Sequence, residues 1–429
     1  MKFTNSFSKT SKDVPSDEQS KNAKLLIRAG YIHKEMAGVY SFTPIGYKTL
    51  QNIIRIIREE MNKIGGEEMF MTTLQDSNLY KKTDRWDDGK VDIWFKTKLK
   101  NDTEIGMGFT HEEDITNIAT RFINSYKDLP KMAYQFQNKF RNETRAKSGI
   151  MRTKEFIMKD LYSFSKDVEQ HEAIYNKVSD AYVTIFKRLG IGEKTHKTFA
   201  SGGSFAKYSH EFQTVCEAGE DEVYVCDRLC IAINKEVFNN EVLKDLGISQ
   251  GEVRVEVTSE VGNIFSLGTK FSSALNLKYK DHVGTDQKVI MGSYGIGPAR
   301  VMGVMCELMS DEAGLVWPHE VAPYALHLVS LHKEEGDEVY NYTKDIYEKL
   351  IQNNIDVIWD DRTGHGTGEK LGDADLMGVP MRVLVSAKTI LEDSVEIKER
   401  LQNKNPDQKR SAGEITKTEV FLKSYSEGC

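Results

Sequence analysis

The amino-acid sequence predicts an α+β protein, in which an antiparallel β-sheet flanked by helices precedes a smaller α/β domain. The main body mixes amphipathic helical runs with strand-like runs that pair as antiparallel neighbours. After about residue 325, strand-like runs instead alternate with helical ones, which is typical of an α/β domain. Two prolines in "VWPHEVAPY" (316–324) separate these regions. We therefore expect one domain at 1–318 and a second at 322–429.

The composition excludes several classes of protein. A length of 429 residues fits two or three domains, and a net charge of −7 excludes a protein coated in basic charge, though not a local basic face. No stretch approaches the roughly 20 apolar residues that cross a membrane, and the start of the chain lacks the apolar region of a secretory signal. An odd number of cysteines, five, favours a reducing compartment, so we expect a cytoplasmic protein without membrane contact.

The cysteines also bear on metal binding. Cys226 and Cys230 form a C-x3-C pair, but no second Cys/His pair follows at ligand spacing. Structural zinc requires four such ligands. We therefore expect no structural zinc and name no metal-ligating residue.

The main body begins with a predicted helix, turn and helix over residues 19–64. In the second helix, apolar residues recur at three- and four-residue spacing opposite a charged face, and Gly65-Gly66 ends it. A further helix is expected at about 112–125. The short strand-like runs before it are 67–74, 91–99 and 104–110.

Two aromatic-rich runs, 131–144 and 151–165, predict an antiparallel strand pair joined by "RAKSGI" (145–150). A helix is expected at about 169–189, whereas 226–256 shows no strong pattern. The strands expected in the C-terminal domain are 325–331, 355–361, 381–387 and 395–400.

The stretch "KVIMGSYGIGPARVMGVMCEL" (288–308) combines an apolar strand, a glycine turn and a helix, which suggests a phosphate site. It is not a dinucleotide fingerprint, because Arg300 stands where the third glycine belongs, and "GHGTGEKL" (364–371) fails as a P-loop. Pro298 suits the first helical turn. A cation beside the positive end of the helix dipole costs roughly 0.3–1 kcal/mol. Arg300 is thus expected to meet an anion, the alternative being an arginine that reaches into solvent.

Charged residues on the strand pair suggest a second part of the site. In a strand, Arg141 and Glu143 share one face, so the arginine could hold a phosphate while the glutamate accepts a hydrogen bond from a base amino group. Phe156 could stack on a base. The alternative is a solvated strand face with cross-strand ion pairs.

The stretch "FTHEED" (109–114) offers a hydroxyl and a carboxylate two residues apart, Thr110 and Glu112, which could hold a substrate ammonium. The same letters also fit a helix start with Thr110 as N-cap and Glu113 completing a capping box. His111 is not expected to act as a catalytic base, because no nucleophile with a fixed partner can be identified nearby.

Taken in order, these blocks resemble the signature motifs of the class II aminoacyl-tRNA synthetases, and in detail those of the bacterial-type prolyl-tRNA synthetases, from about residue 3 to 400. The blocks are "GVYSFTPIGYKTLQNIIRIIREEMNKIGGEEMFMTTLQ", "GFTHEE", "YQFQNKFRNETRAKSGIMRTKEFIMKDLYSF", "SGGSFAKYSHEFQ", "VGNIFSLGTKFS" and "MGSYGIGPAR". The resemblance implies the antiparallel class II sheet and a C-terminal anticodon-binding domain. It also implies a homodimeric proline–tRNA ligase that uses ATP with Mg2+, proline and tRNA(Pro).

The resemblance assigns roles to residues. Motif 1 (about 38–75) would build the dimer interface, motif 2 (about 134–164) and motif 3 (about 288–308) the ATP site, with Arg141 and Arg300 as the catalytic residues. ATP contacts would be Arg141, Glu143, Arg152, Phe156, Glu260, Asn263 and Arg300. Proline contacts would be Thr110, Glu112, Arg141 and Phe265. Anticodon contacts would be Asp361, Arg362 and Lys370, within the glycine-rich stretch 359–378.

Three departures from the family pattern stand out. Motif 1 usually ends in a proline where this chain has Thr72, and Asn263 stands where relatives commonly have histidine. Residues 226–256 are a short linker where bacterial relatives carry a large editing domain, and they are too few to form one.

Two alternative functions remain open at the level of sequence. One is a class II synthetase for threonine, serine, glycine or histidine, although the Cys/His ligand set of a zinc-using threonine site is not found in these blocks. The other is a non-catalytic tRNA-binding paralogue. Such a protein should lose the ATP-site arginines, whereas Arg141, Arg152 and Arg300 are all present.

Overall fold

The computed structural model describes residues 1–144, 148–201, 208–400 and 413–426. The predicted "RAKSGI" loop lies partly outside these residues. The described chain divides into two compact units, one of residues 36–39 and 54–304, the other of residues 1–35, 40–53 and 305–429.

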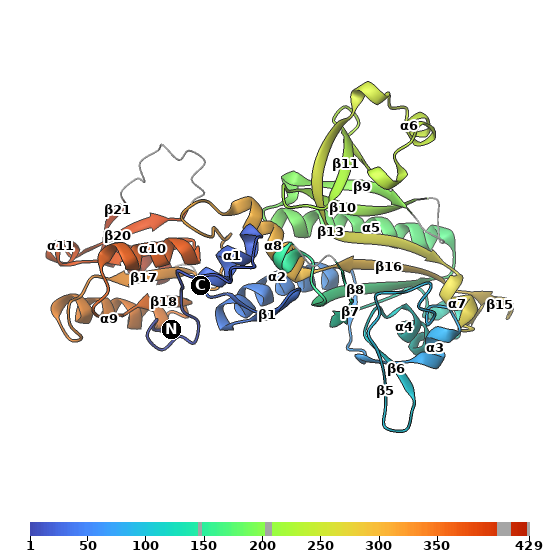
Figure 1. Ribbon diagram of the computed structural model, residues 1–429, viewed down its shortest axis with the longest axis horizontal. Coiled ribbons are helices and arrows are strands. Elements are labelled where there is room, and N and C mark those ends of the chain that lie inside the picture. The colour runs from blue at the N-terminus through green and yellow to red at the C-terminus, as the bar shows by residue number, and fades with distance from the viewer. Residues whose placement is uncertain (145–147, 202–207, 401–412, 427–429) are drawn as a thin grey trace. The chain divides into compact units, whose positions relative to one another are not determined.

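The unit of residues 54–304 is built on a nine-stranded sheet (Figure 1) with the order β10-β9-β12-β11-β13-β16-β8-β7-β3. The predicted strand pair is confirmed: β7 (Lys131–Phe140) lies antiparallel to β8 (Glu155–Ser165). On the other side of β8 lie β16 (Ile290–Ile296) and then β13 (Arg254–Gly268), both in antiparallel pairing. The remaining strands are β3 (Glu67–Glu68), β9 (Thr195–Ser201), β10 (Tyr208–Val215), β11 (Asp221–Cys226) and β12 (Ile231–Asn234).

Helix α5 (Val168–Arg188) lies along β8, β13 and β16, as expected for the predicted helix at 169–189 (Figure 1). Its apolar face buries Ile174, Val178, Ile185 and Phe186. A second apolar cluster joins the strands to α4 (Glu112–Ala119) and α7 (Lys270–Ala274) through Ile115, Phe164 and Phe271. These packed helices fix the strands that carry the polar residues of the site.

Residues 226–256 are more ordered than their weak sequence pattern indicates. They form β12, α6 (Asn240–Leu246) and the start of β13, packed around a small apolar cluster. Gly247, in the left-handed conformation at φ 67°, caps α6. The pattern was missed because the buried residues Cys226, Ile233 and Val242 come from three short elements, none long enough to show a period.

Several predicted elements differ in length, and the strands expected at 91–99 and 104–110 form only over residues 96–98 and 104–107. The strand expected at 67–74 is split into β3 and β4 (Leu74–Asp76), and the helix expected to reach residue 125 ends at Ala119. In place of a continuing helix, Arg121 N–H bonds the Ile118 carbonyl in a tighter turn. Strand β4 joins β6 (Glu104–Met107) and β5 (Lys96–Lys98) in a three-stranded sheet beside α3 (Ser77–Lys81). A separate hairpin pairs β14 (Lys278–Lys280) with β15 (Asp286–Lys288).

The predicted helix-turn-helix at 19–64 contains a β-hairpin in place of its turn. Helix α1 (Lys21–Arg28) is followed by β1 (Ile32–Met36) and β2 (Val39–Phe42), and α2 (Pro44–Lys63) then begins earlier than expected. Gly46 allows the close approach of α2 to the chain before β1, because a Cβ atom there would lie 1.9 Å from the Tyr31 carbonyl oxygen.

The α/β region at the end of the chain is confirmed. Its five-stranded sheet has the order β18-β17-β19-β20-β21, parallel from β18 to β19 and antiparallel beyond. The strands are β17 (Leu326–Ser330), β18 (Val357–Asp360), β19 (Met381–Val385), β20 (Ser394–Glu399) and β21 (Glu414–Lys417). Around them pack α9 (Glu338–Gln352), α10 (Thr367–Met377), α11 (Ala387–Leu391) and α12 (Thr418–Ser426), and α8 (Pro298–Met309) precedes the region in the chain.

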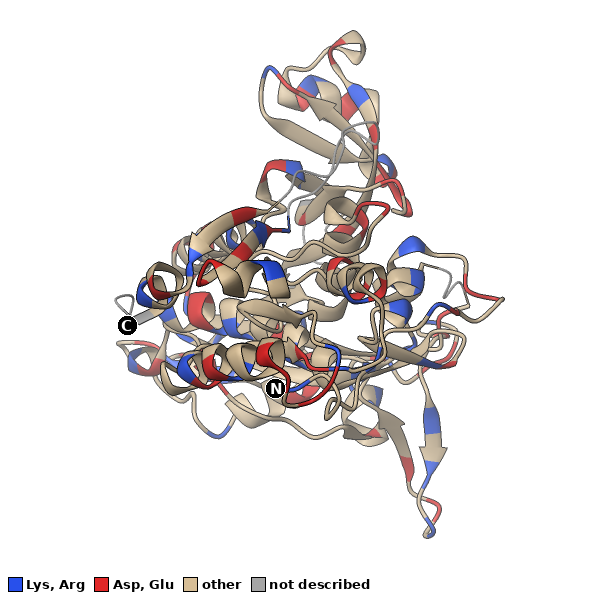
Figure 2. Ribbon diagram, turned by 90° about the vertical axis from the view of Figure 1, so that its left-hand side faces the viewer, with Lys and Arg blue, Asp and Glu red and all other residues tan. Residues whose placement is uncertain are grey.

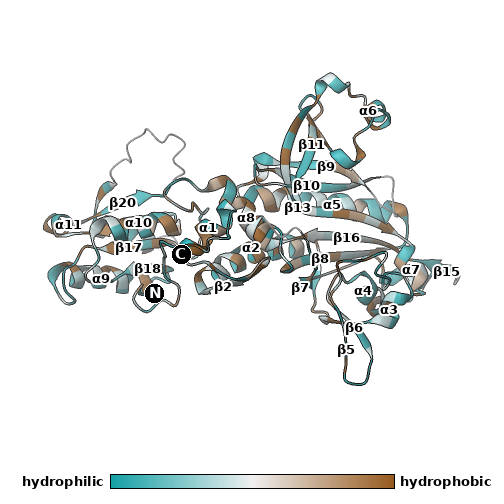
Figure 3. Ribbon diagram, in the orientation of Figure 1, coloured by the Kyte–Doolittle hydropathy of each residue, from teal (hydrophilic) through white to brown (hydrophobic). Residues whose placement is uncertain are grey.

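Both signs of charge are distributed over the helices and strands (Figure 2), and apolar and polar stretches alternate along them (Figure 3). Within the described ranges, no helix is long and apolar enough to cross a membrane. In the same part of the chain, no group of three or more His, Cys, Asp or Glu side chains is placed to hold a metal ion.

Candidate active site

One pocket in the unit of residues 54–304 collects all seven residues predicted to contact ATP. They come from the end of β7 (Arg141), from the β7–β8 connection (Glu143, Arg152), from β8 (Phe156), from β13 (Glu260, Asn263) and from the first turn of α8 (Arg300). The further lining residues are Ile150, Met151, Thr153, Ile157, Met158, Val261, Gly262, Gly295 and Gly297. Segments far apart in sequence thus meet in one pocket over the strands β8, β13 and β16.

Arg141 does not lie in a strand, contrary to the prediction. Strand β7 ends at Phe140, and Arg141 makes only an isolated bridge with Trp94, so the shared-face argument for Arg141 and Glu143 fails. Its guanidinium lies 5.4 Å from the ring of Phe156 and 5.1 Å from that of Phe109. Its Nε is buried and has no hydrogen-bond partner among the described residues.

The pKa of Arg141 is lowered, first by burial and then by the positive charge of Arg300. An arginine nevertheless stays protonated in a protein. Two guanidinium groups therefore converge on this pocket, and one of them has a donor left without a partner. A bound anion would relieve both penalties.

Arg300 is held in place by its neighbours. Pro298 begins α8, as predicted. The Arg300 Nε donates to the Met151 carbonyl oxygen at 2.8 Å, and Nη1 donates to the Glu260 carbonyl oxygen at 2.9 Å, with the Glu260 carboxylate 3.3 Å away. These contacts orient the cation toward the pocket that Arg141 also lines.

Glu143 and Arg152 bind each other. The Arg152 Nε and Nη2 donate to Glu143 Oε2 at 3.1 and 2.9 Å, and Nη1 donates to Glu220. Burial opposes the charge of Arg152, but Glu220 and Glu143 outweigh it and raise its pKa. A nucleotide that contacts both residues must therefore share them with this ion pair.

Asn263 is fixed between two strands. Its Nδ2 donates to Glu260 Oε1 at 2.8 Å, and its Oδ1 accepts from the Gly295 N–H at 3.2 Å. Gly295 has to be small here, since a Cβ atom would lie 2.9 Å from Asn263 Oδ1. The asparagine that departs from the family pattern thus links β13 to β16 and orients Glu260.

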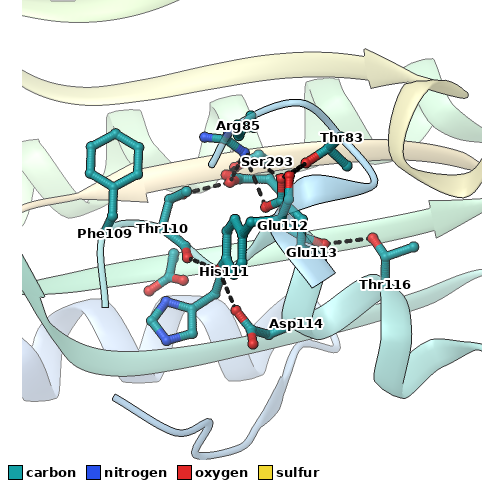
Figure 4. Close-up of polar contacts among 12 residues, drawn as sticks. Thr83, Arg85, Phe109, Thr110, His111, Glu112, Glu113, Asp114, Thr116 and Ser293 are labelled. Atoms are coloured by element: carbon teal, nitrogen blue, oxygen red, sulfur yellow. Dashed lines mark hydrogen bonds and ion pairs between the residues drawn. The ribbon is translucent and has the colours of Figure 1, made fainter. Parts of the chain in front are cut away.

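Of the predicted proline contacts, only Arg141 is among the residues that line this pocket. The polar contacts of Thr110 and Glu112 are drawn in Figure 4. The Thr110 hydroxyl donates to Glu112 Oε2 at 2.5 Å, and Glu112 Oε1 lies 3.5 Å from the Ser293 hydroxyl. Ser293 in turn stands opposite Phe265 in the pairing of β16 with β13. Thr110 and Glu112 are thus linked through Ser293 to the strand pair that carries Phe265.

The predicted capping box at Thr110 is wrong. The residue before α4 is His111, which makes no side-chain cap, and the Thr110 hydroxyl bonds Glu112 rather than the backbone. The Glu113 carboxylate accepts from Thr83 Oγ1 at 2.6 Å and from Arg85 Nη1 at 3.2 Å. Arg85 also holds Glu112, at 2.9 Å, a partner that no local sequence pattern indicated.

Beneath this loop lies a buried polar network that the sequence pattern did not reveal. The Lys139 ammonium contacts His111 Nδ1 at 2.6 Å and Asp160 Oδ2 at 3.0 Å, and His111 Nε2 lies 3.0 Å from the Thr72 carbonyl oxygen. The ammonium can only donate, so Nδ1 accepts and Nε2 carries the proton. Burial, followed by Lys139, lowers the pKa of His111, so this histidine is neutral.

The alternative interpretation of the strand pair, a solvated face with cross-strand ion pairs, does not hold for Lys159. It is fully buried, and its ammonium bonds the Tyr182 hydroxyl and the Tyr294 carbonyl oxygen. Burial lowers the pKa of Lys159 well below its ordinary value.

Of the predicted anticodon contacts, Asp361 and Arg362 directly follow β18 and Lys370 lies in α10. All three side chains are engaged with protein groups. Asp361 accepts from the backbone and hydroxyl of Thr4 at 2.9 and 2.7 Å. Arg362 pairs with Asp360 and Asp373 at 2.7 and 2.8 Å. Lys370 is 1% exposed and donates to the Ser330 carbonyl oxygen at 2.8 Å. The glycine-rich stretch is a loop only until Gly366, since α10 begins at Thr367.

Comparison with known proteins defines the class first. Residues 95–309 match the tRNA synthetase class II core domain (G, H, P, S and T), and residues 327–421 match the anticodon binding domain. The fold is shared with the prolyl-tRNA synthetase of Giardia lamblia in complex with prolyl-adenylate, at TM-score 0.75 and 19% identity over 95% of this chain and 79% of that one. The protein is thus a class II aminoacyl-tRNA synthetase with a C-terminal anticodon-binding domain.

Relatives identified by sequence show to which family of class II synthetases the chain belongs. The proline–tRNA ligase of Ehrlichia ruminantium (strain Gardel) is 34% identical over 99% of both chains, and that of Azorhizobium caulinodans is 35% identical over 94% of this chain and 96% of the relative. This chain belongs to the prolyl-tRNA synthetases, the proline–tRNA ligases. The family predicted from the sequence motifs is confirmed.

Proposed function

We propose that this chain activates proline with ATP to prolyl-adenylate and then transfers the prolyl group to the 3′ end of tRNA(Pro). The observation that carries the proposal for the site is the convergence of Arg141 and Arg300 on one pocket, with a buried Arg141 donor that lacks a partner among the described residues. An α-phosphate and a substrate carboxylate are the two anions of this reaction, and a planar guanidinium suits both.

In the first step, a carboxylate oxygen of proline attacks the α-phosphorus of ATP and pyrophosphate leaves. Arg141 would contact both the α-phosphate and the carboxylate, and Arg300 would lie on the γ-phosphate side. Phe156 would stack on adenine, Glu143 would accept from its amino group, and Arg152 would add a phosphate contact. In the second step, the terminal ribose hydroxyl of tRNA attacks the prolyl carbonyl and AMP leaves. Positioning and charge stabilisation supply the catalysis, without a protein nucleophile.

Mg2+ enters this reaction as part of the substrate, on the phosphate oxygens of ATP. Such an ion keeps several waters and needs only one or two carboxylates from the protein. Glu260 faces the pocket and is the nearest candidate for a direct or water-mediated contact. Together with Asn263, it would position the nucleotide.

Proline would lie between the Thr110–Glu112 loop and Phe265. Its positively charged imino nitrogen would meet Glu112, whose pKa is kept at about 2 because Arg85 and the Thr110 hydroxyl outweigh the effect of burial. A carboxylate that stays ionised at neutral pH suits a cationic nitrogen.

We also propose the division of labour along the chain. Residues 1–318 would carry catalysis, and residues 322–429 would read the anticodon through Asp361, Arg362 and Lys370. A homodimer would form through motif 1, where Phe70 and Leu74 are 77% and 59% exposed on either side of Thr72. The cytoplasm would be its compartment, as the odd number of cysteines in the sequence favours a reducing environment.

ATP–pyrophosphate exchange against a panel of amino acids tests the proposal. We expect exchange that depends on proline. Exchange that depends instead on threonine, serine, glycine or histidine would indicate a sister class II activity. No exchange with any amino acid by the folded protein would indicate a non-catalytic paralogue.

A further inference from the structure

Two adjacent buried carboxylates at the start of α4 share a single cation. Glu112 and Glu113 are 9% and 0% exposed. The Arg85 Nη1 lies 2.9 Å from Glu112 Oε2 and 3.2 Å from Glu113 Oε2 (Figure 4). Two carboxylates in such a place cannot both ionise at little cost without a positive charge between them. Arg85 supplies that charge.

Arg85 is itself firmly placed. It belongs to the segment between α3 and β5, where its N–H bonds the Tyr80 carbonyl oxygen at 3.1 Å. Its guanidinium lies 5.5 Å from the ring of Phe271 and 5.9 Å from that of Phe109. The same segment contributes Thr83, which donates to Glu113 Oε1 at 2.6 Å. The guanidinium of Arg85 is therefore held in place, and Glu113, also held in place, competes with Glu112 for its positive charge.

This arrangement determines which oxygen of Glu112 faces the substrate. Oε2 is engaged by the Thr110 hydroxyl and by Arg85, whereas the contact of Oε1 within the described ranges is the long one of 3.5 Å to Ser293. With Oε2 engaged, Oε1 is the oxygen left to meet a cationic nitrogen. Rotation of the carboxylate would break two charge-assisted hydrogen bonds.

We propose that Arg85 is a positioning residue for proline activation. Arg85 keeps Glu112 ionised and oriented toward the imino nitrogen, while Glu113 binds the same guanidinium. The inference rests on the proposed role of Glu112. It goes beyond that role because Arg85 would not touch proline or ATP.

The proposal predicts a selective loss in Arg85→Gln. Burial and the neighbouring Glu113 would then raise the pKa of Glu112, so a neutral carboxyl would meet the prolinium ion. In pyrophosphate exchange, the KM for proline should rise about ten- to hundredfold, as for a lost hydrogen bond to a charged group, while the KM for ATP stays unchanged. The KM for proline should also fall again as the pH is raised and Glu112 ionises. Arg85→Lys should recover part of the affinity.

The competing carboxylate gives a second, independent readout. Adding Glu113→Gln to Arg85→Gln removes the like charge beside Glu112 but leaves an oxygen for Thr83. The double variant should therefore bind proline better than Arg85→Gln alone. The titratable and charged groups near Glu112 and Glu113 are Tyr80 from α3, Arg85 from the following segment, Lys139 from β7, Arg141 just after β7 and Tyr162 from β8. The Thr83 hydroxyl also donates to Glu113.

Controls separate the possible failures. Arg228→Gln breaks an exposed arginine–glutamate pair in the same unit, with Glu252, and should change neither KM. If Glu112→Gln leaves the KM for proline unchanged, the proposed site is wrong. If Glu112→Gln raises it and folded Arg85→Gln does not, the role of Arg85 is wrong. A parallel rise of both KM values with a lower melting temperature in Arg85→Gln and Arg85→Lys would also overturn it, since that is the behaviour of a merely structural residue.

Discussion

A single guanidinium distinguishes the candidate site from an ordinary surface cleft. Most arginines near the pocket have carboxylate or carbonyl partners, as Arg152 and Arg300 do. Arg141 is instead flanked by two aromatic rings and keeps a buried Nε without a partner among the residues described. A donor in this state is stabilised when an anion arrives, so binding and charge neutralisation are coupled at one side chain.

Arg141→Ala should therefore abolish adenylate formation and leave the fold intact. Loss of a preorganised charge contact of this kind typically costs about 2.7–4 kcal/mol, or about 10²–10³ in rate. Pyrophosphate exchange measures the effect, and circular dichroism checks the fold. Arg228→Ala, at an exposed ion pair, is the matched control. Near-normal exchange by a folded Arg141→Ala protein would contradict the assignment.

The buried Lys139–Asp160 pair leads to a prediction about stability. Both side chains are almost fully buried, and removal of one partner leaves the other charge uncompensated, which typically costs about 3–5 kcal/mol. Lys139→Met should lower the free energy of unfolding by that amount, measured by denaturant titration. Lys81→Met breaks a pair that is nearly half exposed, with Glu104, and should cost about 1 kcal/mol or less. Equal losses in the two variants would show that the buried network contributes no more than a surface pair.

Residues with a chemical signature in the sequence could be predicted, and residues that act through tertiary contacts could not. Arg141 and Arg300 stand in motifs whose spacing is specific. Arg85 stands in a stretch rich in lysine, aspartate and aromatic residues, where nothing marks one cation as different from the next. Lys139 stands two residues before Arg141, and no local pattern shows that its side chain is buried. Only the fold brings Arg85 to the start of α4, which follows two strands later in the chain.

Among the elements, the loop after β18 combines a predicted role with an unexpected degree of order. Arg362 is held by two aspartates, one of them buried, and its guanidinium lies 4.3 Å from the ring of Phe3. Lys370 points inward to Ser330. If this loop reads the anticodon, part of its work is to present a preorganised backbone to unstacked bases.

We therefore expect different results from the two cations. Arg362→Ala should weaken tRNA charging and spare pyrophosphate exchange, because exchange needs no tRNA. Lys370→Ala removes a buried hydrogen bond and should lower the melting temperature as well. The two assays, with thermal unfolding, separate these effects. If exchange fell together with charging in Arg362→Ala, the loop would be structural rather than a tRNA contact.

Element boundaries show why the sequence was informative for long elements and less so for short ones. Helix α5 and the β7–β8 pair have enough residues for a clear period, and both were predicted. Strand β7 stops one residue before Arg141, where the chain turns so that Glu143 N–H bonds the Arg141 carbonyl oxygen. That turn depends on the partner strand and on Trp94, which a local pattern does not contain.

At the scale of the whole molecule, the chain has the length of its curated relatives, covering 99% of one and 96% of another. Residues 226–256 form only the small lobe around α6, with its own cluster of five buried apolar residues. We therefore expect discrimination between amino acids to depend on the activation pocket.

Alanine is smaller than proline by about two methylene groups. Burial of these groups favours proline over alanine by only about 1.6 kcal/mol, or about fifteenfold in binding. Tight packing around Phe265 could raise this to about 1–3 kcal/mol per methylene. We predict measurable Ala-tRNA(Pro) formation and no hydrolysis of pre-formed Ala-tRNA(Pro) by the purified protein. Deacylation well above the spontaneous rate would show that the α6 lobe has a hydrolytic role.

Strand β13 carries Glu260 and Asn263, the proposed nucleotide contacts, and Phe265, the proposed amino-acid contact, within six consecutive residues. The two substrates would thus bind along one strand. The pairing of Asn263 with Gly295 and of Phe265 with Ser293 on β16 would fix the distance between them. Consider a compound that joins a proline-like ring to an adenosine by a linker of matching length. It would lose translational and rotational entropy once on binding, whereas two separate ligands lose it twice. The geometry of one strand therefore specifies the length of a bisubstrate inhibitor for this enzyme.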